Sequence, residues 1–273
     1  IFIKYFNTTK RKPIINKNMC KKIINYNLRN VLYFLLKKKV SFNNNYLNQF
    51  VIQSCKNNWI QCFNILINDH KIDIKKINDN ENNILQYACI GGNVNMVKYI
   101  LKKKINFKIY NNYHENPLHI ALWNKNKNLA NYLVKLNIFD LKSLTNNNHN
   151  VIHFCCIKNN YITLKKILEK NNKIINDKDN DGYTPLHYST ENNNDLITEL
   201  LIDNECDVNI KNNNFQTPLH LACDHGNYEI VKLLLNCDDI VINKKDIYGK
   251  TPFKIARQWQ YDDIIELFED KLI

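Results

Sequence analysis

Four histidines recur along the chain at a nearly constant spacing, at His119, His153, His187 and His220. Imidazole nitrogens bind metal ions and transfer protons near neutral pH, so a row of histidines could form a metal centre or a catalytic site. His153 and Cys156 would also lie about one turn apart on a single helix. Two ligands alone do not make a metal site, and the recurrence at a fixed spacing favours a structural role for the whole row.

The nine cysteines could likewise hold a metal or form disulfides. Five of them lie in or beside the position two residues after the histidine position: Cys55, Cys89, Cys155, Cys156 and Cys223. A free thiol there packs as a compact apolar group, and the sequence contains no Cys-x-x-Cys pair that would resemble a zinc knuckle. We therefore expect reduced, structural thiols, which indicate a cytoplasmic or nuclear protein.

Motifs typical of catalysis are missing from the sequence. It contains no glycine-rich phosphate loop, no Gly-x-Ser-x-Gly elbow and no His-Glu-x-x-His helix. Its acidic residues are scattered, and the pair Asp262-Asp263 is interpreted as a solvated helix face. We expect neither an enzyme nor a cofactor site.

The elements that position these residues follow from a repeat. The tetrapeptide Thr-Pro-Leu-His occurs at 184–187 and again 33 residues later at 217–220. The same step, with 33 or 34 residues between units, places equivalent positions at Ile52, Gln86, His119, His153, His187, His220 and Lys254, and more loosely at Lys21. A fixed period of this length predicts a solenoid of small stacked units.

The unit at 179–211 indicates how each repeat folds. Asp181-Gly182 forms a turn, Thr184 caps a helix, and Pro185 occupies the first helical position, where its missing N–H costs nothing. Pro117, Pro218 and Pro252 hold the same position in other units. Apolar residues follow at helical spacing, so we predict a short helix, a tight loop and a longer helix. A small residue lies two positions after each histidine position, which allows close approach of neighbouring helices: Ser54, Ala88, Ala121, Cys155, Ser189, Ala222 and Ala256.

This pattern resembles the ankyrin repeat, whose signature is Thr-Pro-Leu-His-x-Ala. The resemblance implies an all-α solenoid of stacked helix–loop–helix units with short turn or hairpin tips. It covers residues 14–273 as a single array, preceded by an N-terminal extension at 1–13. The expected units are 14–44 as N-terminal cap, 45–77, 78–110, 111–144, 145–178, 179–211, 212–245, and 246–273 as C-terminal cap. The family resemblance also assigns the repeated histidine a hydrogen bond that ties adjacent units together.

Two positions depart from the family pattern. Ankyrin repeats place glycine six residues after the histidine position, where this chain has Gly92 and Gly226 but also Asn58, Asn159 and Asn193. Asparagine tolerates the left-handed backbone region, so the loop geometry should be kept. Lys125 breaks this rule and leaves the geometry of its loop open. Phe215 takes the usual glycine position of a turn, which leaves open an altered backbone and a projecting ring.

Noncatalytic protein–protein recognition on the concave face is the function that the resemblance implies. Partners of ankyrin repeats are usually held by turn residues before the histidine position and by helix residues just after it. At those positions, or at the turn glycine, the sequence presents Tyr46, Tyr113, Trp123, Tyr183, Phe215, Tyr248 and Trp259. Tyrosine and tryptophan are common interface anchors, so we predict that an unidentified protein partner contacts this stripe. Trp259 could instead pack in the C-terminal cap, and Tyr113 could cover its own hairpin.

The formal charge of +12 suggests a first alternative, a lysine-rich surface that binds nucleic acid or another polyanion. Only Arg11, Arg29 and Arg257 are arginines, and the chain is also rich in Asn and Ile. Because Lys, Asn and Ile share AT-rich codons, base composition explains this balance without a basic ligand. Lysines near helix ends also have a structural reason, the helix dipole. We therefore do not expect nucleic acid as the partner.

A second alternative is that the array targets an enzyme, such as a ubiquitin-ligase adaptor or a kinase. The first residue is Ile1 rather than Met, so a catalytic module could lie in a longer chain. The opening hydrophobic run at 1–6 is too short for a persuasive secretory signal, and no apolar run is long enough to span a membrane. We expect a monomer. Asn209 resembles the asparagine that some asparaginyl hydroxylases modify, but a loop asparagine that bonds backbone groups is the favoured interpretation.

Overall fold

The computed structural model describes residues 15, 17–74, 82–103 and 110–272. The predicted extension at 1–13 and the hydrophobic run at its start lie outside these residues. Within them the regular elements are sixteen α-helices, without a strand, which confirms the predicted all-α repeat fold. None of the described helices is long and apolar enough to cross a membrane.

The chain divides into two compact units, Ile1–Asn124 and Lys125–Ile273. The described helices of the first unit are α2 (Lys17–Asn25), α3 (Arg29–Lys37), α4 (Asn44–Lys56), α5 (Ile60–Asn68), α6 (Ile84–Ile90), α7 (Val94–Lys102) and α8 (Pro117–Trp123). Helices α2, α4, α6 and α8 contact one another in succession and form one layer, while α3 packs on α5 in a second layer.

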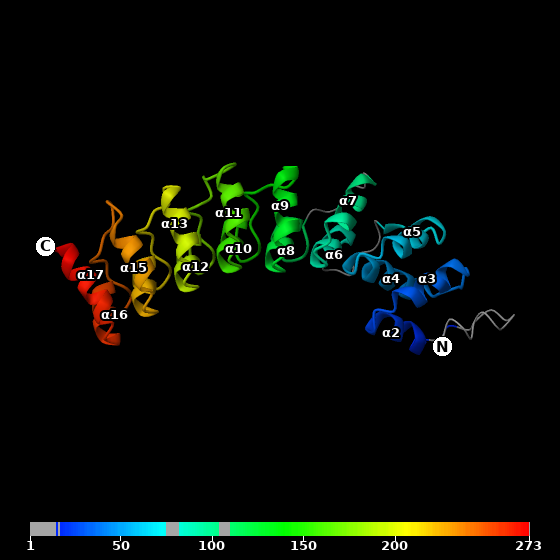
Figure 1. The fold of residues 1–273 in the computed structure, drawn as a ribbon, viewed down its shortest axis with the longest axis horizontal. Helices are drawn as coiled ribbons and strands as arrows, with labels where there is room; N and C mark the ends of the chain where they lie inside the picture. The colour runs from blue at the N-terminus through cyan, green and yellow to red at the C-terminus, as the bar shows by residue number, and fades with distance from the viewer. Residues whose placement is uncertain (1–14, 16, 75–81, 104–109, 273) are drawn as a thin grey trace. The chain divides into compact units, whose positions relative to one another are not determined.

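The second unit repeats this two-layer arrangement. Its helices are α9 (Lys127–Leu136), α10 (Val151–Ile157), α11 (Tyr161–Leu168), α12 (Pro185–Glu191), α13 (Asp195–Asp203), α14 (Pro218–Asp224), α15 (Tyr228–Leu235), α16 (Pro252–Trp259) and α17 (Asp262–Leu272). Helices α10, α12, α14 and α16 contact in succession, and so do α9, α11, α13, α15 and α17. Figure 1 shows the helix pairs of this unit following one another from green to red.

Small side chains allow the first helices of the repeats to pack closely. The residues two positions after each histidine position are all completely buried: Ser54, Ala88, Ala121, Cys155, Ser189, Ala222 and Ala256. Within each unit the helices bury apolar side chains, and Phe50 and Phe63 in the first unit and Phe268 in the second are among the largest that are fully buried. Each helix therefore buries its stripe only by stacking on its neighbours, as a solenoid requires.

The first helices begin with a repeated cap. In α8, the side chain of Asn116 accepts the backbone N–H groups of Leu118 and His119, at 2.9 and 3.1 Å. The N–H of Asn116 is donated in turn to Nδ1 of His119, at 3.2 Å. Helices α8, α12, α14 and α16 start at prolines, in sequence order Pro117, Pro185, Pro218 and Pro252. These caps satisfy N–H groups that the start of a helix leaves without partners.

The loop within each repeat keeps one backbone geometry whatever residue occupies it. The position six after the histidine position has a positive φ in Asn58, Gly92, Lys125, Asn159, Asn193, Gly226 and Gln260. Lys125, at 57°, therefore has the same left-handed conformation as the asparagines and glycines. The stack imposes this conformation even where the local preference of lysine opposes it.

The turn at Phe215 is also unaltered. Its φ of 59° is close to the 76° of Gly182 and the 72° of Gly249 at equivalent positions. The possibility of a changed backbone is therefore not realised, whereas the projecting ring is, because Phe215 is 53% exposed.

Candidate protein-binding surface

Three of the repeated histidines form hydrogen bonds through both ring nitrogens, Nδ1 within the repeat and Nε2 to the following repeat. In His187, Nδ1 accepts the backbone N–H of Thr184 at 3.1 Å, and Nε2 donates to the carbonyl oxygen of Gln216 at 3.1 Å. The same two bonds recur at His153 and His220, each with a carbonyl of the following repeat as acceptor. This geometry requires the neutral ring with its proton on Nε2.

Burial favours that neutral form. It lowers the pKa of His153 and of His187 to about 4, although hydrogen bonds to backbone carbonyls oppose the shift. The pKa of His220 is lowered for the same reason. Over the described ranges, no group of three or more His, Cys, Asp or Glu side chains is arranged to hold a metal ion.

Gln86 occupies the histidine position in the third repeat and makes equivalent bonds. Its Oε1 accepts the N–H of Asn83 at 2.7 Å, and its Nε2 donates to the carbonyl oxygen of Glu115 at 3.3 Å. A carboxamide offers one acceptor and one donor in the same sense as a neutral imidazole. The position thus requires this pair of hydrogen-bonding atoms rather than the acid–base chemistry of histidine.

All nine cysteines carry free thiols, and every one except Cys237 is buried. Burial raises the pKa of Cys62 to about 11 and that of Cys206 to about 12. The thiolate is the reactive form of cysteine, so these groups act as apolar filling of the core.

Five of the seven aromatic residues predicted to bind a partner are at least half exposed. Tyr113, Trp123, Phe215 and Trp259 are 52–55% exposed and Tyr248 is 82% exposed. The other two are half-buried: Tyr46 lies in α4, and Tyr183 packs on the rings of His187 and Tyr188 with centroids 5.3 Å apart in each case.

In the second unit, the structure brings part of the aromatic stripe together at the turn tips. Ile247 donates its N–H to the carbonyl oxygen of Asn214 at 2.9 Å, so Phe215 and Tyr248 lie on adjoining tips. Similar bonds join the tips at Asn147, Asn180, Asp181 and Asn213. Trp259 lies apart on α16, where its indole N–H is donated to Asp224 Oδ1 at 2.8 Å.

In the first unit, Tyr113 and Trp123 line one pocket of about 370 Å³ together with Asn82, Ile90, Asn111, Glu115, Ile120 and Asn124. The repeat pattern predicted the two aromatic residues as partner contacts, but it did not predict Glu115. Its position four residues before His119 carries other residue types in other repeats, so the sequence offered no pattern that would mark it.

Some further exposed apolar side chains were not predicted, and two of them occupy the same position in neighbouring repeats. Ile162 and Leu196 are 56% and 62% exposed at the starts of α11 and α13. Both lie nine residues after a histidine position, in consecutive repeats. Because they begin amphipathic helices, the sequence pattern alone did not separate them from the buried stripe.

A buried carboxylate, Asp179, holds the tip of the sixth repeat. Its Oδ2 accepts the Tyr188 hydroxyl at 2.6 Å and lies 3.2 Å from His149 Nε2. Its Oδ1 accepts the N–H groups of Asp181 and Tyr183, at 3.0 and 2.8 Å. Burial alone would raise the pKa of Asp179, but these hydrogen bonds outweigh it and lower the pKa to about 2.

Asp179→Asn should therefore lower the free energy of unfolding by about 2 kcal/mol at pH 7. Because the folded-state pKa is depressed, the stabilisation is present above pH 4 and is lost as the pH falls toward 2. Urea unfolding at pH 7 and pH 3 measures this effect. Asn111 and Asn212 occupy the equivalent position, so the turn itself accepts asparagine. An equal change in the exposed control Asp181→Asn would contradict this interpretation.

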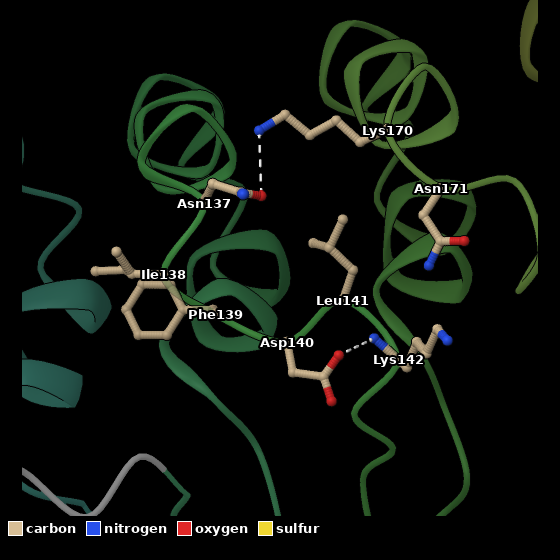
Figure 2. Close-up of a pocket in the computed structure, with 8 residues that line it drawn as sticks. All are labelled: Asn137, Ile138, Phe139, Asp140, Leu141, Lys142, Lys170 and Asn171. Carbon is tan, nitrogen blue, oxygen red and sulfur yellow. Dashed lines mark hydrogen bonds between the residues drawn. The ribbon is translucent and has the colours of Figure 1, made fainter.

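A second pocket, of about 470 Å³, lies between the end of α9 and the end of α11 (Figure 2). The Lys170 ammonium donates to the Val134 carbonyl oxygen at 2.7 Å and lies 3.5 Å from Asn137 Oδ1. Asp140 Oδ1 accepts the N–H of Lys142 at 2.9 Å. These hydrogen bonds connect the segments that line the pocket.

Several lysines of the second unit bridge neighbouring repeats. Lys178 Nζ donates to the carbonyl oxygen of Lys211 at 2.8 Å, and Lys211 Nζ to that of Lys245 at 2.7 Å. Lys244 Nζ donates to the carbonyl oxygen of Asn209 at 2.7 Å. These ammonium groups are held on the backbone, which gives part of the basic excess a structural use.

Asn209 itself fixes the loop of the next repeat. Its Nδ2 donates to the Asp239 carbonyl oxygen at 2.8 Å, and its Oδ1 accepts the N–H of Val241 at 2.9 Å. Both ends of the side-chain amide are therefore engaged in the inter-repeat loop.

Comparison with known proteins identifies the repeat. The sequence matches the family described as "Ankyrin repeats (3 copies)" over residues 21–108, 51–143, 135–212 and 191–271. No curated protein sequence matches the chain.

Solved structures share its fold. One is a chain of the complex described as "Bd0816 Predatory Endopeptidase from Bdellovibrio bacteriovorus in complex with immunity protein Bd3460", with 25% identity and a TM-score of 0.61, covering 67% of this chain and 95% of that one. Another is the ankyrin repeat domain of Bcl-3, a member of the IkappaB protein family, with 18% identity and a TM-score of 0.66, covering 81% of this chain and 97% of that one. At the latter identity the likeness concerns the fold alone.

Proposed function

Because the chain belongs to the ankyrin repeat family, whose members generally mediate protein–protein interaction, we propose that it is a noncatalytic scaffold that binds a protein partner. The contact surface in each unit consists of the turn tips and the exposed side of the first helices. We call this the tip-and-helix surface. Its anchors are Tyr113 and Trp123 in the first unit, and Phe215, Tyr248 and Trp259 in the second.

The exposure of these five aromatic side chains carries the proposal. Each leaves at least half of its surface in water, although burial of an aromatic ring is worth several times the thermal energy. All five occupy turn or inner-helix positions of the repeat rather than scattered sites. Aromatic side chains are enriched at the centres of protein interfaces, where a few of them account for most of the affinity.

The nine free thiols support a reducing compartment, the cytoplasm or nucleus, for this function. We propose a monomer in that compartment, since a rigid array needs no second copy to present its surface. The bridging lysines support a protein partner rather than nucleic acid, because their ammonium groups already contact backbone carbonyls.

Partner capture tests the proposal. The 273-residue chain serves as bait beside two double variants, Tyr113→Ala/Trp123→Ala and Tyr248→Ala/Trp259→Ala. At least one double variant should bind the captured partner about tenfold or more weakly, since two anchors are removed. Helicity by far-UV circular dichroism should be unchanged, because the rings lie largely outside the core.

Ile162→Ala is the matched control, an exposed apolar side chain at the start of a second helix and outside the tip-and-helix surface. It should bind like the natural chain. Full binding by both double variants, or an equal loss in the control, would exclude the tip-and-helix surface as the contact.

A further inference from the structure

We propose that the pocket framed by Tyr113 and Trp123 receives a basic side chain of the protein partner, arginine in preference to lysine, with Glu115 as the counter-charge. This inference rests on the proposed function and specifies the chemistry of one contact. All the residues concerned lie in the first unit.

The pocket has aromatic walls that are open to solvent. Tyr113 comes from the turn tip and Trp123 from the end of α8, and they are 55% and 52% exposed. Ile90 and Ile120 also line the pocket and contribute apolar surface. The volume of about 370 Å³ is sufficient for the end of a long side chain. A guanidinium can stack on the face of an aromatic ring, which attracts a cation electrostatically.

Glu115 is held in place from several directions. Its Oε2 accepts Asn111 Nδ2 at 2.8 Å, and its N–H is donated to Asn111 Oδ1 at 2.8 Å. Its carbonyl oxygen accepts the N–H of Asn111 at 3.1 Å and Nε2 of Gln86 at 3.3 Å. The backbone of Glu115 is therefore fixed, and the Asn111 amide holds one oxygen of its carboxylate.

The charge of Glu115 is not neutralised within the part of the chain that the structure describes. No lysine or arginine there forms an ion pair with it, although the sequence contains 38 basic residues. A half-buried carboxylate in a pocket that two aromatic side chains also line repels an acidic ligand and loses solvation under an aliphatic one. A cationic side chain pairs with the carboxylate and is attracted to the faces of the aromatic rings. Charge complementarity therefore selects a basic side chain.

Nuclear magnetic resonance of the full chain tests this assignment without any partner. The indole N–H signal of Trp123, identified by its loss in Trp123→Phe, is followed during titration with N-acetyl-arginine amide or N-acetyl-citrulline amide. The two probes share their shape and differ in charge. The arginine probe should bind about tenfold more tightly than the citrulline probe. The buried Trp59 should report no shift, which serves as the internal control.

The variant Glu115→Gln keeps an oxygen that can accept the Asn111 bond and removes only the charge. Its preference for the arginine probe over the citrulline probe should be much smaller than that of the natural chain, because only the attraction of the ring faces is left. Equal binding of both probes by the natural chain, or an unchanged arginine preference in Glu115→Gln, would overturn the inference. Partner capture that still depends on Tyr113 and Trp123 would then leave the proposed function standing, with an uncharged ligand in this pocket.

Discussion

Replacing His153 and His187 together by glutamine should leave stability near pH 7 almost unchanged and should greatly reduce the loss of stability that acid causes in the natural chain. Gln86 makes the same two bonds at the equivalent position, so the substitution keeps an acceptor and a donor where the imidazole had them. What it removes is a group that can take up a proton.

The sign of the effect follows from burial. The pKa of each of these histidines is about 4 in the folded protein, below the ordinary value of 6.5. Between these values the unfolded chain binds the proton and the folded chain does not, so acid favours unfolding. Stability is full above pH 6.5 and falls as the pH decreases toward 4. Each histidine should account for about 3 kcal/mol of this loss.

Urea unfolding at pH 7, 5.5 and 4.5 measures the effect. The natural chain should lose stability steadily over this range, and the double glutamine variant should lose much less. His187→Ala is the control for the bonds themselves, since it should already be destabilised at pH 7 by the loss of both partners. Parallel pH profiles for the natural chain and the glutamine variant would show that these two histidines do not control acid stability.

The glutamine at position 86 also explains why the fold could be predicted from one sequence. The repeat specifies hydrogen-bonding atoms and side-chain volume at fixed positions, and those are visible in residue types: His or Gln at the cap, and a small residue two places later. Lys125 illustrates how strongly the stack imposes its geometry, because the left-handed loop forms there without the glycine or asparagine that local preference favours.

The chemistry of the pocket lined by Tyr113 and Trp123 was harder to predict from the sequence than the fold. Glu115 matters because it lines one pocket together with Tyr113, Trp123 and Ile90, and these residues come from two repeats. A periodic pattern gives the position of each residue within its repeat, but it does not give the space that unlike side chains leave between repeats.

The structural roles of the asparagines could not be predicted from the sequence either. We interpreted the abundance of asparagine from the sequence as an effect of base composition. In the structure Asn148, Asn180 and Asn213 bridge consecutive tips, and Asn194 and Asn227 bond carbonyls of the preceding repeat. These asparagines therefore have structural roles that composition does not reveal.

Gly91→Ala should destabilise the first unit by about 3 kcal/mol, against the local preference of the residue. Gly91 ends α6 with φ of −70°, a conformation that alanine adopts readily. Helix propensity would therefore favour alanine by up to about 1 kcal/mol. Packing opposes the change, because a Cβ at this position would lie 2.7 and 2.8 Å from the carbonyl carbon and the Cα of Lys56 and would overlap its carbonyl oxygen.

The obstacle is backbone at the end of α4, so no side-chain rotation relieves it and the two helices must separate. Separation would open the contacts around Ser54 and Ala88, which are fully buried in this layer. Denaturant unfolding, with hydrogen exchange to locate the loss in α4 and α6, measures the effect.

Gly249→Ala is the matched control. Its φ of 72° strains an alanine, but nothing lies within 4 Å of the added carbon, so only the turn is affected, by about 1–2 kcal/mol. If Gly91→Ala were as stable as the natural chain, or less affected than Gly249→Ala, local helix preference rather than the contact between α4 and α6 would govern this position. A larger loss of stability in Gly91→Ala than in Gly249→Ala means that the close packing of neighbouring first helices outweighs local propensity. The packing of the repeats outweighs local propensity at Lys125 as well, where it imposes a left-handed backbone.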